Sequence, residues 1–348
     1  MNGDKIAMSF NIWNRRYTGS KFKLVDWIVD LIQENCTGES FCDIFGGTGV
    51  VAAKILPHMK VLYINDLLYA NELSYKAFFG KEKVNYDIIE KFSKKYSDLK
   101  VEKIKENYIS KNYGGKFFSN NDAKLIGYIR EDIEKAEIIN QQERNILLTS
   151  LIYSADKSAN TVGHYDAYIK GKEFRDKFKF DLINPVNSKN KDIVITREDA
   201  NVLAENLVCD IVYIDPPYNS RQYSRFYHVL ENIVTWKKPE LEGIALKPPM
   251  ENMSEYCRSN AKFAFEDLIM KLNCQYIVIS YNNTYLSKSK SSRNKIEFED
   301  MVNILNKKGT VLKFERKHQF FNAGKTKFND HKEYVYIVKV GIKHDSEK

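Results

Sequence analysis

The stretch between residues 40 and 66 constrains the fold most, because it alternates an apolar strand, a glycine-rich turn, a helix and a second strand. In chain order its pieces are a strand at residues 40–45, the cluster Gly46-Gly47-Thr48-Gly49, a helix at residues 50–56 closed by Pro57, and a strand at residues 61–64 followed by Asp66. The strands are short runs of apolar and β-branched residues, and the proline stops the helix. This order is the first half of a Rossmann-like unit and predicts an α/β fold.

The strand pattern resumes far downstream. Five later segments share β-branched and aromatic character, and they lie at residues 192–196, 210–214, 275–280, 309–315 and 333–340. We expect the last two to form an antiparallel pair at the edge of the sheet. Helix-compatible stretches lie between the strands, at residues 226–236 and 263–272. The sum is an α/β sheet of about seven strands.

The middle of the chain lacks this pattern. It carries long charged, helix-compatible segments, such as residues 86–109 and 122–151, with a lysine- and glycine-containing interruption at residues 111–116. We therefore expect an inserted, mainly helical subdomain between the second and third strands. The predicted division is a catalytic domain formed by residues 1–75 and 190–348, and an inserted region formed by residues 76–189.

Two features of the first unit point to a cofactor that contains adenosine. Glycines at the strand-to-helix turn let a ligand approach the backbone closely. Asp66 stands 23 residues after Asp43, at the end of the next strand, where an acid commonly receives the two ribose hydroxyls of such a cofactor. From Phe45 to Gly49 the turn reads Phe-x-Gly-x-Gly, without the Gly-x-Gly-x-x-Gly spacing that holds a dinucleotide pyrophosphate. This difference disfavours a nicotinamide dehydrogenase.

The second chemical feature is the tetrapeptide Asp215-Pro216-Pro217-Tyr218, which follows the apolar strand at residues 210–214. Such strand ends bind ligands in α/β sheets. The Asp215 carboxylate and the Pro216 carbonyl can each accept one N–H of an exocyclic amine such as N6 of adenine, which aims the lone pair of the amine at a methyl group. The prolines fix the direction of the carbonyl, and Tyr218 offers a face for an extruded base. The tetrapeptide thus predicts methyl transfer, with Asp215 as an orienting acceptor rather than a strong base.

With these motifs the chain resembles the DNA adenine methylase (Dam-like) family, the α-class site-specific N6-adenine DNA methyltransferases of restriction–modification and related systems. The matching segments lie at residues 17–21, 43–49, 63–66, 215–218 and 279–282. The order also fits, with the cofactor motifs first, an inserted target-recognition region next and the tetrapeptide after it. The resemblance implies that S-adenosylmethionine is the cofactor and that the substrate is an adenine flipped out of double-stranded DNA. It also makes a cognate restriction endonuclease a plausible partner in a bacterial cell.

The resemblance also implies roles for individual residues. The implied contacts to the methyl donor come from Tyr17, Lys21, Phe45, Gly47, Gly49, Asp66, Asp199 and Asp215. Lys21 is expected to pair with the donor carboxylate, and Asp199 to accept a hydrogen bond from the amine of the donor adenine. Ala200, beside Asp199, replaces an aromatic residue that some members carry, and Tyr17 stands where some relatives have Trp. The implied catalytic residues are Asp215, Pro216, Pro217 and Tyr218.

Charge and two unusual loops indicate how DNA is bound. The net charge of +8 favours a polyanionic partner, and lysines and arginines on phosphates would provide most of the affinity. The candidates for these contacts are Arg15, Arg16, Lys288, Lys290, Arg293, Lys325 and Lys327. Arg16 could also reach a guanine edge. The polar and aromatic loops lie at residues 160–168, with Asn160, His164 and Tyr165, and at residues 219–223, with Arg221.

Composition narrows the class of protein further. No apolar run approaches the ~18–20 residues that span a bilayer, and the N-terminus lacks the layout of a signal peptide, so we expect a cytoplasmic protein without membrane contact. We also expect a monomer. The five cysteines show no Cys-x-x-Cys spacing and do not pair with histidines at ligand intervals, which disfavours a metal site or a disulfide framework.

Four other functions stay open at this point. An N4-cytosine methyltransferase also acts on an exocyclic amine, but that class typically has Ser in place of Asp215. Methylation of adenine in RNA would use the same chemistry. Protein-glutamine methyltransferases usually begin the tetrapeptide with Asn. A non-catalytic DNA-binding module derived from a methyltransferase is disfavoured by the intact Asp215, Tyr218, Asp66 and glycine turn.

Overall fold

A seven-stranded sheet forms the centre of the protein in the computed structural model, which describes residues 8–171, 173–218, 220–283, 295–317 and 332–341. In spatial order its strands are β5 (Asp192–Thr196), β3 (Val61–Asn65), β2 (Ser40–Asp43), β6 (Ile211–Ile214), β7 (Tyr276–Asn282), β9 (Lys332–Val340) and β8 (Gly309–Lys317). The first five are parallel, while β9 runs antiparallel to β7 and β8. The predictions of an α/β sheet of about seven strands and of an antiparallel edge pair are confirmed.

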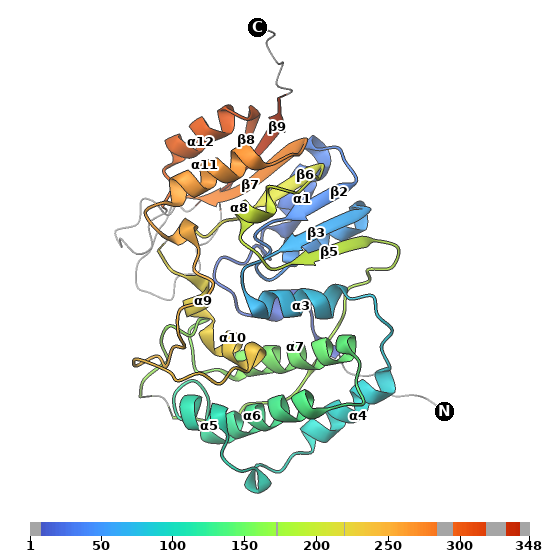
Figure 1. Cartoon of the computed structure of the whole chain (residues 1–348), viewed down its shortest axis with the longest axis vertical. Helices are drawn as coiled ribbons and strands as arrows, with labels where there is room; N and C mark the ends of the chain where they lie inside the picture. The colour runs from blue at the N-terminus through green and yellow to red at the C-terminus, as the bar shows by residue number, and fades with distance from the viewer. Residues whose placement is uncertain (1–7, 172, 219, 284–294, 318–331, 342–348) are drawn as a thin grey trace.

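The central strands are apolar on both faces because helices cover both sides. On β2 and β6, Phe41 and Tyr213 face the core shared with α1 (Val25–Asn35) and α2 (Val50–Ile55), whereas Cys42 and Val212 face the opposite core. That opposite face is covered by three further helices, α8 (Ala200–Leu203), α11 (Ala261–Lys271) and α12 (Phe298–Asn306). Figure 1 shows α11 and α12 in front of the sheet and α1 behind it.

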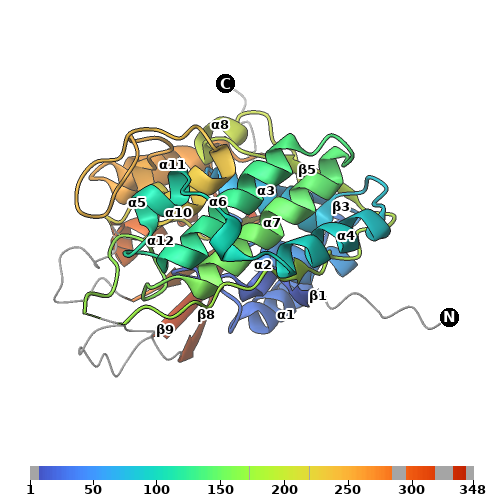
Figure 2. The same cartoon turned by 90° about the horizontal axis from the view of Figure 1, so that it is seen from below.

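A layer of helices lies below the sheet in Figure 1. Its members are α3 (Tyr69–Phe79), α4 (Tyr86–Ser97), α5 (Tyr108–Tyr113), α6 (Asn120–Lys135), α7 (Gln141–Ser158) and α10 (His228–Thr235). Seen from below, α3, α6 and α7 run across the end of the molecule (Figure 2). Helix α7 packs on α3, and α10 packs on both. Helix α10, which follows β6 in the chain, therefore belongs to a layer built mostly from residues 76–189. The division into two domains stays a prediction.

Some details of the helical layer differ from the sequence expectation. Within residues 86–109, α4 ends at Ser97 and α5 begins after Asn107, whose side chain accepts a hydrogen bond from the Ser110 backbone at 3.1 Å. The segment 122–151 is divided between α6 and α7, because Asn140 and Glu143 form a capping box at the start of α7. A small parallel sheet of β1 (Met8–Phe10) and β4 (Leu182–Ile183) was not expected. None of the helices in the described ranges combines the length and apolar character that a bilayer span requires.

The strand order creates the position of the site. From β2 the chain continues to β3 on one side, whereas β6 pairs with β2 on the other side. The crevice outside the carboxyl ends of the strands at such a change of direction is where open α/β sheets bind ligands. Asp43, Asp66 and Asp215 all lie at these ends, within or directly after β2, β3 and β6.

Candidate active site

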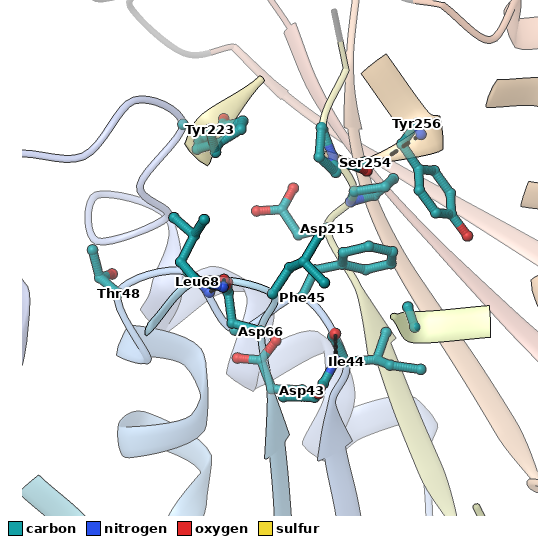
Figure 3. Close-up of a pocket in the computed structure, with 18 of the residues that line it drawn as sticks. Asp43, Ile44, Phe45, Thr48, Asp66, Leu68, Asp215, Tyr223, Ser254 and Tyr256 are labelled. Carbon is teal, nitrogen blue, oxygen red and sulfur yellow. Dashed lines mark hydrogen bonds between the residues drawn. The ribbon is translucent and has the colours of Figure 1, made fainter. Parts of the chain in front are cut away.

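A pocket with about 940 Å³ of empty space, part of it open to solvent, lies at the carboxyl ends of β2, β3 and β6. Figure 3 shows Asp43 and Asp66 at neighbouring strand ends and Asp215 further along the same opening. The residues predicted from the sequence that line it are Tyr17, Lys21, Phe45, Gly47, Asp66, Asp199, Asp215, Pro216, Pro217 and Tyr218. Gly49 caps α2 behind the turn instead. Two motifs separated by about 150 residues thus share one cavity.

The glycine turn and Asp66 form one wall. Gly47 and Gly49 have φ angles of +55° and +80°, the left-handed region that favours glycine. The Gly47 backbone N–H donates to Asp66 at 2.9 Å, and the Leu68 N–H donates to the other carboxylate oxygen at 2.9 Å. Burial raises the pKa of Asp66, and these backbone donors oppose the rise. The carboxylate is therefore held in place at the floor of the pocket.

An aromatic slot forms beside this wall. The rings of Phe45 and Tyr256 meet edge to face with centroids 5.0 Å apart (Figure 3), and Ala200 also lines the pocket. Asp199 stands at the N-terminus of α8, where it accepts the Asn201 backbone N–H at 2.9 Å. A flat apolar slot with an acceptor nearby is suited to a purine that carries an exocyclic amine. Tyr256 was missed from the sequence because nothing in its local pattern links it to Phe45, 211 positions earlier.

Asp215 is held by one group from a distant part of the chain, Lys21, and by one from its own tetrapeptide, Tyr218. The Lys21 ammonium lies 2.9 Å from Asp215 and 2.8 Å from the Tyr218 hydroxyl. Tyr218 donates its hydroxyl proton to Asp215, and its oxygen also lies 3.2 Å from the Ser280 carbonyl. Lys21 lies four residues before α1, which begins at Val25. The resemblance implied that Lys21 pairs with the donor, but here its partner is the carboxylate of the tetrapeptide.

The protonation states in this cluster follow from its charges. Burial lowers the pKa of Lys21, but the neighbouring Asp215 and Glu333 carboxyls outweigh burial and raise it. Burial and the charge of Asp215 hold the pKa of Tyr218 well above its ordinary value. Lys21 is therefore charged and Tyr218 neutral at physiological pH, so both can donate to Asp215. This arrangement fixes the orientation of the Asp215 side chain.

Asp43, at the end of β2, behaves differently. It is 1% exposed, and its Oδ1 atom has no hydrogen-bond partner among the described residues. Burial, with the charges of Asp215 and Asp66, holds its pKa well above the ordinary value. Asp43 is therefore a buried lining group of the pocket whose ionisation burial and the neighbouring carboxyls oppose.

Aromatic rings also form the rim of the pocket. Tyr17 stacks on Tyr227 with centroids 4.7 Å apart and lies 5.2 Å from Tyr223. The guanidinium of Arg15 lies 5.1 Å from the centre of the Tyr17 ring and donates to Asn71. Arg15 is only 3% exposed, so the expectation that it contacts phosphate is wrong for this conformation. Its charge supports the aromatic rim from beneath.

The residues predicted to contact DNA lie in different surroundings. Arg16 binds the end of α7 through Asp156, and the Asn160 amide donates to the Ile169 carbonyl at 2.9 Å. The Tyr165 ring is fully buried, with its hydroxyl 3.0 Å from Asp156. His164 stacks on Phe226 at 4.5 Å, and the Arg221 guanidinium lies 5.6 Å from the same ring. These assignments stay predictions, and Tyr165 has no surface for DNA in this conformation.

Several other predicted positions cannot be placed. Asn219, from the loop after the tetrapeptide, and the basic residues Lys288, Lys290, Arg293, Lys325 and Lys327 lie outside the described residues.

The methyltransferase class is defined by three features together. They are the α/β sheet, the glycine turn and the Asp-Pro-Pro-Tyr tetrapeptide, and the last two line one pocket. Comparison with known proteins gives the family: the chain belongs to the D12 class N6 adenine-specific DNA methyltransferases, whose family model matches residues 17–304. The resemblance noted from the motifs is confirmed.

Individual relatives cover the chain to different extents. It is 30% identical to the type II methyltransferase M.NlaIII of Neisseria lactamica, over 92% of this chain and 98% of that protein. It is 31% identical to the modification methylase LlaI of Lactococcus lactis subsp. lactis, over 77% of this chain and 46% of that protein. It is 33% identical to the type II methyltransferase M.FokI of Planomicrobium okeanokoites, over 77% of this chain and 44% of that protein. The aligned part thus spans about half the length of the last two relatives.

Proposed function

We propose that this chain is a site-specific DNA methyltransferase that transfers a methyl group from S-adenosylmethionine to the N6 amine of an adenine flipped out of double-stranded DNA. The observation that carries the proposal is a single pocket lined by both the glycine turn with Asp66 and the strand end with Asp215. Membership of the D12 class supports the reaction type. The named type II methyltransferases among its relatives support a role in a bacterial restriction–modification system, with a cognate endonuclease as partner.

The donor side of the pocket fits an adenosine with a charged sulfur substituent. Gly47 has a φ of +55°, which favours glycine, and a Cβ atom there would lie 3.3 Å from the Tyr17 ring, so the turn presents bare backbone to the pocket. We assign the donor adenine to the slot of Phe45 and Tyr256 with Asp199 as acceptor, and the ribose hydroxyls to Asp66. When bound, S-adenosylmethionine supplies an electrophilic methyl group on a positively charged sulfur.

The acceptor side is built from the tetrapeptide. Asp215, held by Lys21 and Tyr218, would accept one N–H of the target amine, and the Pro216 carbonyl would accept the other. These bonds counter the delocalisation of the lone pair into the purine ring and aim it for attack. Tyr218 and Tyr223 both line this part of the pocket and offer faces to an extruded base.

We also propose that residues 76–189 recognise DNA while residues 1–75 and 190–348 carry the chemistry. Support comes from the contact between the helical layer and the rim of the pocket. Asp156 of α7 accepts the Arg16 backbone N–H at 2.9 Å, directly beside Tyr17, and the Tyr227 hydroxyl at the rim lies 3.4 Å from the Gly163 carbonyl. A DNA segment bound along these helices would therefore lie next to the opening into which the base must turn.

The test is transfer of labelled methyl groups from S-adenosylmethionine. Matched DNA and RNA of one sequence are offered to the wild type, to Asp215→Ala and to Glu205→Ala, an exposed acid in the turn after α8 that pairs with Lys271. We expect label in DNA only, with activity lost in Asp215→Ala and kept in Glu205→Ala. Circular dichroism and a thermal melt show whether the Asp215 variant keeps its fold. Label in RNA, or an Asp215→Ala variant as active as wild type, would contradict the proposal.

A further inference from the structure

Glu333 is a buried carboxyl group next to the catalytic cluster that methyl transfer, as described above, does not use. It lies on β9 opposite Asn282 of β7 and is 7% exposed. Its Oε2 atom is buried and has no hydrogen-bond partner within the described part of the chain. Burying a carboxylate without full pairing is costly. A group placed at such cost beside an active site is a candidate for function.

The contacts around β7 connect Glu333 to Asp215. The Tyr218 hydroxyl, which donates to Asp215, also contacts the Ser280 carbonyl, and the Tyr213 hydroxyl lies 2.8 Å from the Ser280 hydroxyl. Asn282, two residues further along β7, forms a hydrogen bond with the Glu333 side chain. The titratable groups that face Glu333 are Lys21, Asp215, Tyr213 and Tyr218. Among the described residues Lys21 is the cation of this group: it forms an ion pair with Asp215 at 2.9 Å, and its charge also acts on Glu333.

We propose that Glu333 is a positioning residue for methyl transfer, which shares the Lys21 ammonium with Asp215 and so sets how much negative charge Asp215 presents to the target amine. The inference rests on the proposed function. When Glu333 is ionised, the two carboxylates and one ammonium carry a net charge of −1, and when it is protonated they carry none. Burial raises the pKa of Glu333 to about 7, with Lys21 opposing and Asp215 adding to the rise. The switch between the two states therefore falls in the physiological range.

The sign of the effect follows from the reaction. During transfer the carbon–sulfur bond breaks, N6 gains the methyl carbon, and one N6 proton leaves to solvent. Positive charge develops on N6, next to Asp215, before that proton is lost. A net negative cluster stabilises this charge more than a neutral one does. The transfer rate is therefore expected to rise as pH increases through about 7.

The experiment measures single-turnover methylation of unmethylated bacterial DNA from about pH 5.5 to about pH 8.5, with saturating S-adenosylmethionine. For the wild type we expect a rise of roughly tenfold centred near pH 7. In Glu333→Gln the methylation rate should not change with pH and should equal the rate of the wild type at acidic pH. Its affinity for the donor should be unchanged. The matched control is Glu315→Gln on the neighbouring strand, an exposed acid paired with Lys332 at 2.8 Å, and it should keep the wild-type profile.

A second variant covers the case in which the glutamine protein does not fold. Glu333→Asp keeps a carboxyl group but shortens the side chain, so the inflection should persist at a shifted pH. An inflection near pH 7 in Glu333→Gln, or an unshifted one in Glu333→Asp, would overturn the inference and leave the proposed function intact. A wild type that methylates at no pH would overturn both.

Discussion

Replacing Lys21 with methionine removes the ammonium group that holds Asp215 and keeps the length of the side chain. Lys21 is 5% exposed, and the Asp215 side chain is 16% exposed. The variant therefore leaves a carboxylate in a mostly buried site with only the Tyr218 hydroxyl as its remaining side-chain donor in the described structure. Breaking a buried ion pair on one side costs about 3–5 kcal/mol.

We expect the lower end of that range, a loss of about 3 kcal/mol in unfolding free energy, because Tyr218 still donates and Asp215 keeps some access to water. The neighbouring charges raise the pKa of Lys21 above its ordinary value of 10.5. Stabilisation from a raised lysine pKa is complete below the ordinary value and is lost only as pH rises through the folded value. A measurement at about pH 8 thus lies inside the window. The methylation rate should fall by roughly 100-fold, since Asp215 loses its orienting partner.

Urea unfolding followed by tryptophan fluorescence measures the stability term, and a double-mutant cycle isolates the pair. In an Asp215→Asn background, the Lys21→Met change should cost less than half as much as in the wild type. Equal losses in the two backgrounds would refute the reasoning, because Lys21 would then stabilise the protein by packing alone.

Three further results are expected. Gly49→Ala should lower the melting temperature and cost about 1–2 kcal/mol, because φ is +80° and the new Cβ would lie 2.9 Å from Ile12; an unchanged melting curve would contradict this. Asp66→Asn should weaken S-adenosylmethionine binding in calorimetry roughly tenfold, because an amide has one oxygen that accepts hydrogen bonds where the carboxylate has two. Equal affinity would count against the assigned ribose site. Glu231 accepts two backbone N–H groups at the start of α3, and burial raises its pKa from 4.5 to about 7. The stability that protonated Glu231 contributes is complete below about pH 4.5 and is lost as pH rises through about 7. The fall in unfolding free energy of the wild type over this pH range should therefore shrink by about 3 kcal/mol in Glu231→Gln. Parallel curves of stability against pH for the two proteins would rule this out.

The parts of the site that could be predicted from sequence are those set by local pattern. The β2–turn–α2–β3 unit was predictable because the strand pattern, Gly47, Gly49 and Asp66 lie within one short segment. Asp215 was predictable because two prolines after an apolar strand leave few alternatives for the backbone. These predictions rest on residues that are close together in the chain, and the tertiary structure keeps the local conformations that they predict.

The missed features depend on packing between distant segments. Lys21 and Asp215 are 194 positions apart in the chain, so their pairing depends on how the segment before α1 packs against the end of β6. In the sequence Glu333 stands at the start of the strand predicted at residues 333–340, a position typical of an exposed acid. Its burial results from the pairing of β9 with β7. Tyr256 enters the slot because its 3-10 helix, Glu255–Cys257, packs on α11. Sequence patterns report periodicity and spacing, whereas these contacts depend on which faces meet.

Product identification tests the central claim most directly. Unmethylated DNA is incubated with the protein and S-adenosylmethionine, digested to nucleosides and analysed by mass spectrometry. With wild type, we expect N6-methyladenine as the new methylated base, and with Asp215→Ala we expect none. N4-methylcytosine, or no methylated base in DNA from an enzyme that binds the donor, would contradict the central claim.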